Sequence, residues 1–191
     1  MEIATIIIKR ENIDDFAKER NRALSAVERG KWVLFLDSDE TLSSELKVEI
    51  ENLNSNNQIN GYYIPRKGIV EERLLRLAKK GAGDWERCVH EVWKIKGKVG
   101  YLENPIIHNE DVRISEIVKK ADFYSTLHAK ANKLEKKKSN LFKIIFLPFF
   151  KFFQTLFIKK AYKRGTKGFV FSLFQGFQSF LSWTKLYFLH S

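Results

Sequence analysis

A single stretch of the chain, residues 31–40, places the strongest constraint on its fold. Residues 32–36 are all apolar, rich in aromatic and branched side chains, and match the length of a strand. Such a run predicts a strand that is buried on both faces, as in a parallel or mixed sheet with helices on each side. Three carboxylates, Asp37, Asp39 and Glu40, follow at once, where that strand would leave the sheet.

The position of these acids indicates a ligand site. In open α/β sheets, ligands bind just beyond the carboxyl ends of the strands. An acid-x-acid motif at that point suits a divalent cation with oxygen ligands, and such a cation suits a diphosphate. The motif therefore favours a sugar-nucleotide site. The alternative is an ordinary turn or helix cap, which is the commoner role of Asp-Ser-Asp.

The residues that precede this stretch predict a βαβ unit. Residues 3–8 form an apolar run of strand length, and residues 12–30 carry apolar side chains at helical spacing. Asn12 is the expected N-cap of that helix, and Gly30 is its expected C-terminal stop. A strand, a helix and a second strand in this order predict two parallel neighbours in one sheet.

The pattern of apolar residues and turn formers downstream predicts further strands and helices. They are a helix capped by Ser43 or Ser44, a strand at 61–65 that stops at Pro65, two strands at 89–95 and 98–102 joined by a tight turn at Gly97, and a long helix at 115–138. The alternation of strands with helices indicates the α/β class.

The basic charge of the chain is concentrated in its C-terminal third. Residues 129–191 hold thirteen of the 34 Lys and Arg residues, one of the 23 acids and thirteen of the 16 Phe residues. Basic and aromatic residues together are typical of nucleic-acid or membrane binding. Because the Phe residues occur in blocks, and not singly among basic residues, a membrane surface is favoured over nucleic acid. The single cysteine, Cys88, excludes a disulfide framework and fits a reducing compartment.

Residues 141–158 are just long enough to span a bilayer. The run is interrupted by Lys143, Pro148, Lys151 and Gln154. The two lysines and the glutamine fall close to one helical face, which predicts an amphipathic helix that lies in the plane of the membrane interface. A second aromatic helix is predicted at 169–189. The alternative is a helical hairpin that packs on the protein itself.

Several motifs occur in an order that is typical of one enzyme family. They are Phe16-Ala17-Lys18-Glu19-Arg20-Asn21-Arg22-Ala23-Leu24, the stretch from Trp32 to Glu40 with Leu42-Ser43, Val89-His90-Glu91, Pro105-Ile106-Ile107-His108 and Gly165-x-x-Gly168-Phe169. In this order they resemble the family 2 glycosyltransferases, and most of all the lipopolysaccharide-core β-glucosyltransferase-like enzymes. The resemblance covers nearly the whole chain from about residue 5.

The fold that this resemblance implies is a partial GT-A fold. It is a Rossmann-like mixed sheet flanked by helices, followed by a C-terminal amphipathic helical segment. The glycosyltransferase core is expected at 1–112, and the basic, aromatic, membrane-associating segment at 113–191. Members of the family begin with a strand and loop that bind the nucleotide base, and this chain is expected to lack that segment.

The activity that the resemblance implies is inverting transfer of a sugar from a nucleotide-diphospho-sugar, a UDP-sugar, with Mn²⁺ or Mg²⁺. The expected acceptor is a lipid-linked or lipopolysaccharide-type glycan of the cell envelope. The expected location is cytoplasmic and peripheral, at an anionic membrane surface on the inner face of the cell membrane. The alternative is a non-catalytic protein, either a membrane-associated fragment or a partner subunit of a split glycosyltransferase.

The resemblance also assigns roles to single residues. The nucleotide-sugar residues are Arg20, Asn21, Asp37 and Asp39. The metal ligands are Asp39 and His108. The base that takes the proton of the acceptor hydroxyl is Glu91, with Glu86 as the alternative. The acceptor-binding residues are Trp85, which would stack on a sugar face, and His90.

Overall fold

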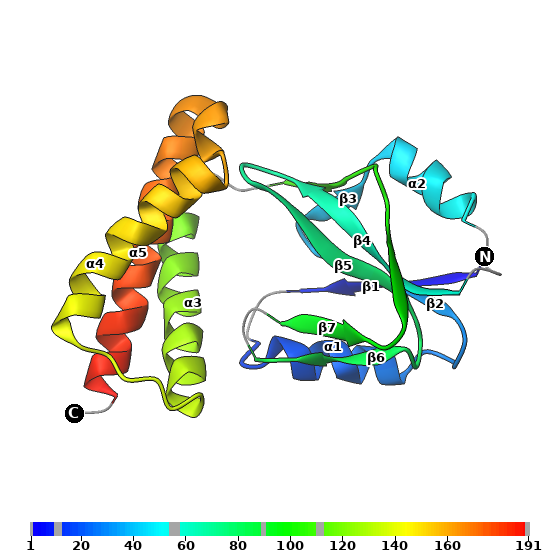
Figure 1. The fold of residues 1–191 in the computed structure, drawn as a ribbon, viewed down its shortest axis with the longest axis horizontal. Coiled ribbons are helices and arrows are strands. Elements are labelled where there is room, and N and C mark those ends of the chain that lie inside the picture. Colours follow the sequence, from blue (N-terminus) through cyan, green and yellow to red (C-terminus); the bar gives the residue numbers. More distant parts are fainter. Residues whose placement is uncertain (1, 10–12, 54–57, 89–90, 110–112, 190–191) are drawn as a thin grey trace. The chain divides into compact units, whose positions relative to one another are not determined.

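The chain forms two compact units (Figure 1). The computed structural model describes residues 2–9, 13–53, 58–88, 91–109 and 113–189. The first unit comprises Met1–Gly68 and Glu72–Asn109, and the second comprises Ile69–Glu71 and Glu110–Ser191. The first unit is a mixed α/β structure and the second is helical.

A curled mixed sheet organises the first unit. Its elements are β1 (Ile3–Ile8), α1 (Phe16–Ser25), β2 (Trp32–Asp37), β3 (Glu40–Leu42), α2 (Ser44–Glu51), β4 (Ile59–Lys67), β5 (Glu71–Lys79), β6 (Gly83–Glu86), β7 (Val92–Ile95), β8 (Lys98–Tyr101) and β9 (Ile106–His108). Seven strands form the sheet in the order β1-β2-β5-β4-β9-β3, with β8 paired to β4. Strands β6 and β7 form a separate two-stranded sheet. The α/β class is therefore confirmed.

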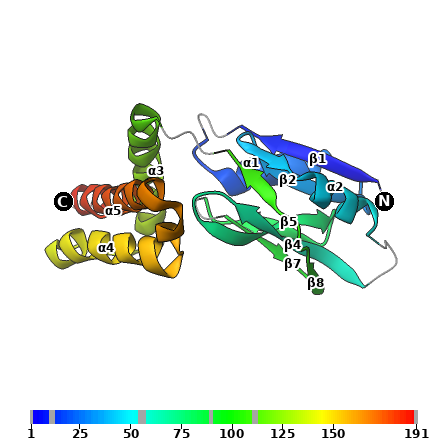
Figure 2. The same ribbon diagram turned by 90° about the horizontal axis from the view of Figure 1, so that it is seen from above.

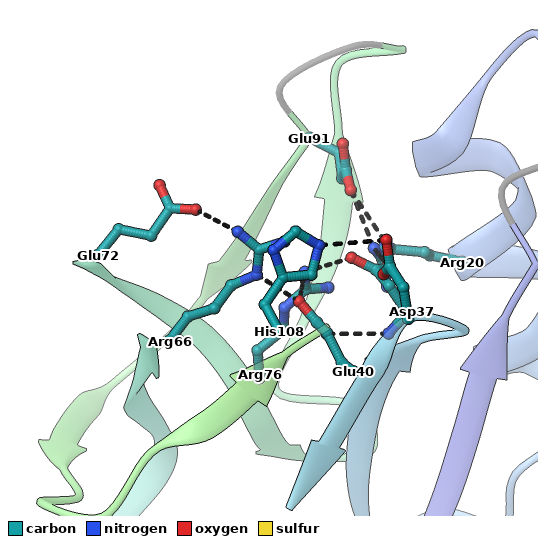
Figure 3. A network of polar contacts seen from close by, with 9 residues as sticks. Arg20, Asp37, Glu40, Arg66, Glu72, Arg76, Glu91 and His108 are labelled. Carbon is teal, nitrogen blue, oxygen red and sulfur yellow. Dashed lines mark hydrogen bonds and ion pairs between the residues drawn. The ribbon is translucent and has the colours of Figure 1, made fainter. Parts of the chain in front are cut away.

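The curl follows from the positions of β2 and β3. Only Ser38 and Asp39 separate these strands in the chain, yet β3 lies at the far end of the sheet order from β1 and β2. The far edge of the sheet must therefore return to the carboxyl end of β2. There β3 pairs with β9 in antiparallel register, with Glu40 opposite His108. The curl brings residues from β4, β5 and β9 to the end of β2 (Figure 3).

Strand β2 is buried along its whole length, as predicted. Its side chains alternate between two hydrophobic clusters. Leu34 packs in the first cluster with Leu46 of α2, and Phe35 packs in the second with Leu24 of α1 and Trp93 of β7. In Figure 1, α2 covers one side of the sheet, while α1, β6 and β7 cover the other. The predicted βαβ unit is also confirmed, because β1 and β2 pair in parallel.

Helix α1 is shorter than the helix predicted at 12–30, and its N-cap prediction was wrong. The N-cap is Asp15, whose carboxylate accepts a hydrogen bond from the Lys18 backbone N–H at 2.9 Å. Asn12 itself lies outside the described residues. Asp15 has an extended backbone, which places its side chain over the first unpaired N–H groups of the helix. Gly30, with φ +85°, lies in the turn before β2 and does not end the helix.

Two strand predictions were also wrong. Strand β4 continues through Pro65 to Lys67. Its register with β8 ends at Tyr63 and its register with β9 begins at Arg66, so Pro65, which has no N–H to donate, falls between these two partners. The strands on either side of Gly97 do not form a hairpin, because β7 pairs with β6 whereas β8 pairs with β4. Their predicted positions hold from Val92 onward, since residues 89 and 90 lie outside the described part.

The second unit is built from helices near the positions predicted for them. They are α3 (Ile114–Leu134), α4 (Leu141–Phe153), the π-helical turn η1 (Gln154–Ile158), the 3-10 turn η2 (Ala161–Arg164) and α5 (Gly165–Phe188). Helix α5 packs on both α3 and α4 (Figures 1 and 2). Gly176 permits the second contact, because a Cβ there would lie 3.0 Å from the Pro148 carbonyl oxygen. Ser172 and Ser182 are also buried, and each hydroxyl donates to a backbone carbonyl of its own helix.

Candidate functional site

A buried ion-pair network lies at the carboxyl end of β2 (Figure 3). At its centre is Asp37, the last residue of β2, whose side chain is fully buried. One carboxylate oxygen accepts a hydrogen bond from Arg20 Nη2 at 2.7 Å, and the other accepts one from Arg76 Nη2 at 2.8 Å. The carboxylate thus neutralises charge on two guanidinium groups, and each of its two oxygens is bonded to an arginine.

Glu40 extends the network into the sheet. Its Oε2 accepts a hydrogen bond from the Asp37 backbone N–H at 2.9 Å, and its Oε1 accepts one from Arg66 Nε at 2.6 Å. Arg66 also donates to Glu72 Oε1 at 3.1 Å. These bonds join the ends of β2 and β3 to β4, so the Ser38–Asp39 turn is held from both of its ends.

Arg20 connects this network to a second carboxylate. From α1 it donates to Asp37 and, through Nε and Nη2, to Glu91 Oε1 at 3.1 and 3.0 Å. Its guanidinium carbon lies 4.7 Å from the Trp85 ring centroid, a cation–π distance. Burial lowers the pKa of Arg20, as does the nearby Arg76 charge, while the two carboxylates oppose that shift.

Asp39 and His108 form the more accessible part of the site. His108 Nε2 lies 3.1 Å from Asp39 Oδ2, and the side chains are 11% and 23% exposed. The Asn109 backbone N–H donates to the Asp39 carbonyl oxygen at 2.8 Å, which fixes the turn against the end of β9. The sequence therefore places two aspartates only two positions apart, and the fold gives them different environments: Asp37 is buried among arginines, and Asp39 reaches solvent.

The Asp39–His108 pair fits a divalent cation that a ligand also coordinates. Across the described ranges, no three His, Cys, Asp or Glu side chains group closely enough to hold a metal ion. Mg²⁺ at phosphate sites is typically held by one or two carboxylates, with phosphate oxygens and water completing its shell. A carboxylate ligand also suits Mn²⁺. Asp39 and His108 are therefore the candidate protein donors for a metal ion at this end of the sheet.

The remaining predicted residues lie apart from the accessible pair. Asn21 clamps the backbone of Trp85: its Nδ2 donates to the carbonyl at 2.8 Å, and its Oδ1 accepts from the N–H at 2.9 Å. Trp85 is 5% exposed and stacks on Trp93, so its indole lies in the core. Glu86 is exposed and pairs with Lys94 at 2.7 Å. His90 lies outside the described residues.

Arg66 and Arg76 are site residues that the sequence analysis did not identify. The alternation of side chains between the two faces of a strand could have identified them. Tyr62 and Ile64 point into the first cluster, and Arg66 is the next residue on that face of β4. Arg76 shares a face of β5 with the buried Ala78. A charged residue that continues a buried face needs a buried counter-charge, which the acids after β2 supply.

Curated proteins that match the chain are named glycosyltransferases. The chain is 28% identical over 179 residues to an uncharacterized glycosyltransferase of Rickettsia conorii, a match that covers 81% of this chain and 64% of that protein. It is 27% identical over 175 residues to the lipopolysaccharide core biosynthesis glycosyltransferase LpsC of Rhizobium meliloti, covering 84% and 65%. An uncharacterized glycosyltransferase of Rickettsia felis matches at 27% over 179 residues, covering 81% and 63%.

The chain is thus similar, over about four fifths of its length, to curated proteins named glycosyltransferases, one of them in lipopolysaccharide core biosynthesis. The resemblance seen in the motifs is confirmed at this level. The chain spans a little under two thirds of the length of these relatives. No protein-family model matches the chain.

Proposed function

We propose that the chain carries the diphosphate–metal corner and the acceptor-side base of an inverting, family 2-like glycosyltransferase. The donor is a UDP-sugar, and the acceptor is a lipid-linked or cell-envelope glycan. The observation that carries the proposal is the accessible Asp39–His108 pair, held at the carboxyl end of β2 by a buried network. The names of the relatives support the same reaction class.

On the donor side, Asp39 and His108 are the residues that would hold Mn²⁺ or Mg²⁺. A cation bound there would neutralise the charge that grows on the leaving diphosphate. The buried Asp37 and Glu40 side chains hold the turn that carries Asp39, because both ends of this turn are hydrogen-bonded. The turn that carries Asp39 is therefore already ordered, and little conformational entropy is lost there when the donor binds.

On the acceptor side, Glu91 is better placed to act as the base than Glu86. Both hydrogen bonds that Arg20 donates to Glu91 are to Oε1, and Oε2 is the oxygen that would take the proton of the acceptor hydroxyl. The hydroxyl oxygen then attacks the anomeric carbon from the face opposite the diphosphate, and the bond to the UDP oxygen breaks. Glu86 belongs to an exposed ion pair on the two-stranded sheet.

Metal removal tests this proposal on the purified full chain. Titration calorimetry with UDP is expected to give binding in Mn²⁺ and none after EDTA treatment, because the diphosphate needs the cation to approach Asp39. UDP release from UDP-glucose, with water in place of the acceptor, is expected to follow the same dependence. Absence of metal-dependent UDP binding would contradict the proposal and favour the non-catalytic alternative, a fragment or a partner subunit.

Membrane attachment through the second unit is the second part of the proposal. No residue of α4 is buried, and Phe146, Phe149, Phe150 and Phe153 are more than half exposed. Residues 141–158 have a mean hydropathy of 1.7 and, by length and composition alone, are sufficient to cross a membrane. Lys143 and Lys151 interrupt the run, and basic residues follow it at 159–167. We place this helix in the interface plane of an anionic, cytoplasmic-side membrane surface.

Vesicle co-sedimentation tests this attachment. The chain is expected to bind vesicles that contain anionic phosphatidylglycerol, and to bind them less as salt is raised. Replacing Lys159, Lys160 and Lys163 with Gln is expected to weaken this binding on the order of 100-fold, from about 1 kcal/mol per lysine near the surface. A matched variant, with Lys47, Lys96 and Lys98 of the first unit changed to Gln, is expected to bind as the unchanged chain does. Equal partitioning to neutral vesicles at every salt concentration would contradict the electrostatic part.

A further inference from the structure

Arg20 touches both sides of the proposed reaction site. We infer that Arg20 is a positioning residue that fixes the base Glu91 relative to the donor-side turn, and that it does not bind the nucleotide. This inference rests on the proposed function, because it assigns Glu91 its role in transfer. It departs from the role that the family resemblance assigns to Arg20.

The hydrogen bonds of Arg20 support this role. Its Nη2 donates to both Asp37 and Glu91, at 2.7 and 3.0 Å, and its Nε donates to Glu91 at 3.1 Å. The side chain is fully buried. Nε and Nη2 are bonded to the two carboxylates, and Nη1, which has no hydrogen-bond partner among the described residues, is buried, so the guanidinium exposes no donor to a phosphate or a base. Its charge therefore serves the two carboxylates.

The surroundings of Arg20 fix its own position. The guanidinium lies 4.7 Å from the Trp85 ring centroid and 5.5 Å from that of Phe35. Asn21, the next residue of α1, holds the Trp85 backbone with two hydrogen bonds. Aromatic rings thus fix the guanidinium of Arg20, and Asn21 on the same turn of α1 fixes β6, the strand that precedes Glu91. Glu91 itself is 17% exposed, so Arg20 holds a carboxylate that still reaches solvent.

The shape of the guanidinium matters as well as its charge. Arg presents its donors in a rigid planar fork, whereas Lys carries a compact charge on a flexible stem. A lysine at position 20 keeps the positive charge but cannot bridge Asp37 and Glu91 in the same way. Arg20→Lys therefore separates the positioning role from the charge of the site, and it is the more informative substitution.

The test is a double-mutant cycle on the full chain with Arg20→Lys, Glu91→Gln and the double variant. Two quantities are measured. The first is turnover, the rate of UDP release at saturating UDP-glucose with Mn²⁺, and the second is the dissociation constant of UDP with Mn²⁺. Arg20→Lys is expected to lower turnover on the order of 10- to 100-fold, since a misplaced base loses its alignment. The UDP dissociation constant is expected to stay within about twofold, because Arg76 still bonds Asp37 and Glu40 still accepts from the Asp37 N–H, so the donor-side turn keeps its support. The double variant is expected to turn over no more slowly than Glu91→Gln, because Arg20 acts through Glu91.

Two further variants separate positioning from damage to the fold. Glu91→Asp leaves Arg20 in place and withdraws the carboxylate by one methylene, and it is expected to lower turnover without changing UDP affinity. Arg66→Lys is the burial control, because Arg66 is also buried and bonds Glu40 and Glu72. Its effect on turnover is expected to multiply with that of Glu91→Gln.

The outcomes of this test distinguish the two proposals. If wild-type chain releases UDP but Arg20→Lys weakens UDP binding, Arg20 contacts the nucleotide and the positioning role is wrong. If the losses of Arg20→Lys and Glu91→Gln multiply, as expected for the Arg66 control, the role of Arg20 is only structural. A wild-type chain that neither binds nor releases UDP contradicts the proposed function itself.

Discussion

Replacing Asp37 with Asn is expected to lower the free energy of unfolding of the first unit by about 3–5 kcal/mol, the cost of removing one partner from a buried ion pair. The carboxylate is fully buried and bonds Arg20 at 2.7 Å and Arg76 at 2.8 Å. Asn has nearly the same size but no charge, so both guanidinium groups lose a shared counter-charge inside the protein. Glu40 remains, but its Oε1 is already bonded to Arg66.

Urea denaturation followed by tryptophan fluorescence measures this effect, because Trp32, Trp85 and Trp93 are buried in the first unit. The midpoint is expected to fall with little change in the slope. The control is Glu86→Gln, which breaks an exposed pair with Lys94 and is expected to cost less than about 1 kcal/mol. If Asp37→Asn costs no more than this control, the network does not stabilise the end of β2.

Replacing Asp39 with Ala is expected to lower metal-dependent activity strongly and to change stability little. Mn²⁺-dependent UDP release should fall on the order of 100-fold or more, because a cation's charge stabilisation is worth several kcal/mol and each 1.36 kcal/mol is tenfold in rate. The free energy of unfolding should change by less than about 1 kcal/mol, since the Asp39 side chain is 23% exposed whereas that of Asp37 is fully buried. We thus expect two aspartates, two positions apart, to contribute differently, Asp37 to stability and Asp39 to metal-dependent UDP release.

Steady-state UDP release and urea denaturation on the same preparation test this contrast. Glu51→Gln serves as the activity control, because Glu51 is an exposed carboxylate on α2 and outside the network. It is expected to leave both quantities unchanged. Retention of Mn²⁺-dependent release in Asp39→Ala would remove Asp39 from the metal role. A large loss of stability in that variant would mean that Asp39 is structural, as Asp37 is.

Local patterns in the sequence predicted much of the first unit. The apolar run at 32–36 identified β2 because a strand buried on both faces needs apolar side chains in both directions. Of the two serines predicted as the cap of α2, Ser43 is the N-cap, since its hydroxyl oxygen accepts from the Leu46 N–H at 3.1 Å. Asp37 and Asp39 were placed at the right edge of the sheet because they follow β2 directly in the chain.

The strand that carries Arg76 could not be predicted in the same way. Residues 71–79 mix charged and apolar side chains, and β5 is stabilised by pairing with β2, for example Leu34 opposite Leu77. That pairing joins residues more than forty positions apart in the chain, so no local signal specifies it. Strand β8 has a similar cause for leaving β7, its neighbour in the chain, because it pairs with the distant β4, for example Tyr101 opposite Tyr63, while β7 pairs with the nearby β6.

The sequence by itself determined the βαβ unit, the buried β2 strand, the cluster of acids after it and the basic, aromatic character of the last third. The tertiary structure alone decided the environment of each acid. The curl of the sheet brings Arg66, Arg76 and His108 to the end of β2, and α1 delivers Arg20 between Asp37 and Glu91. The physical reason is that the environment of a carboxylate depends on which charges the fold places around it, and strand order and register are set by packing between distant segments.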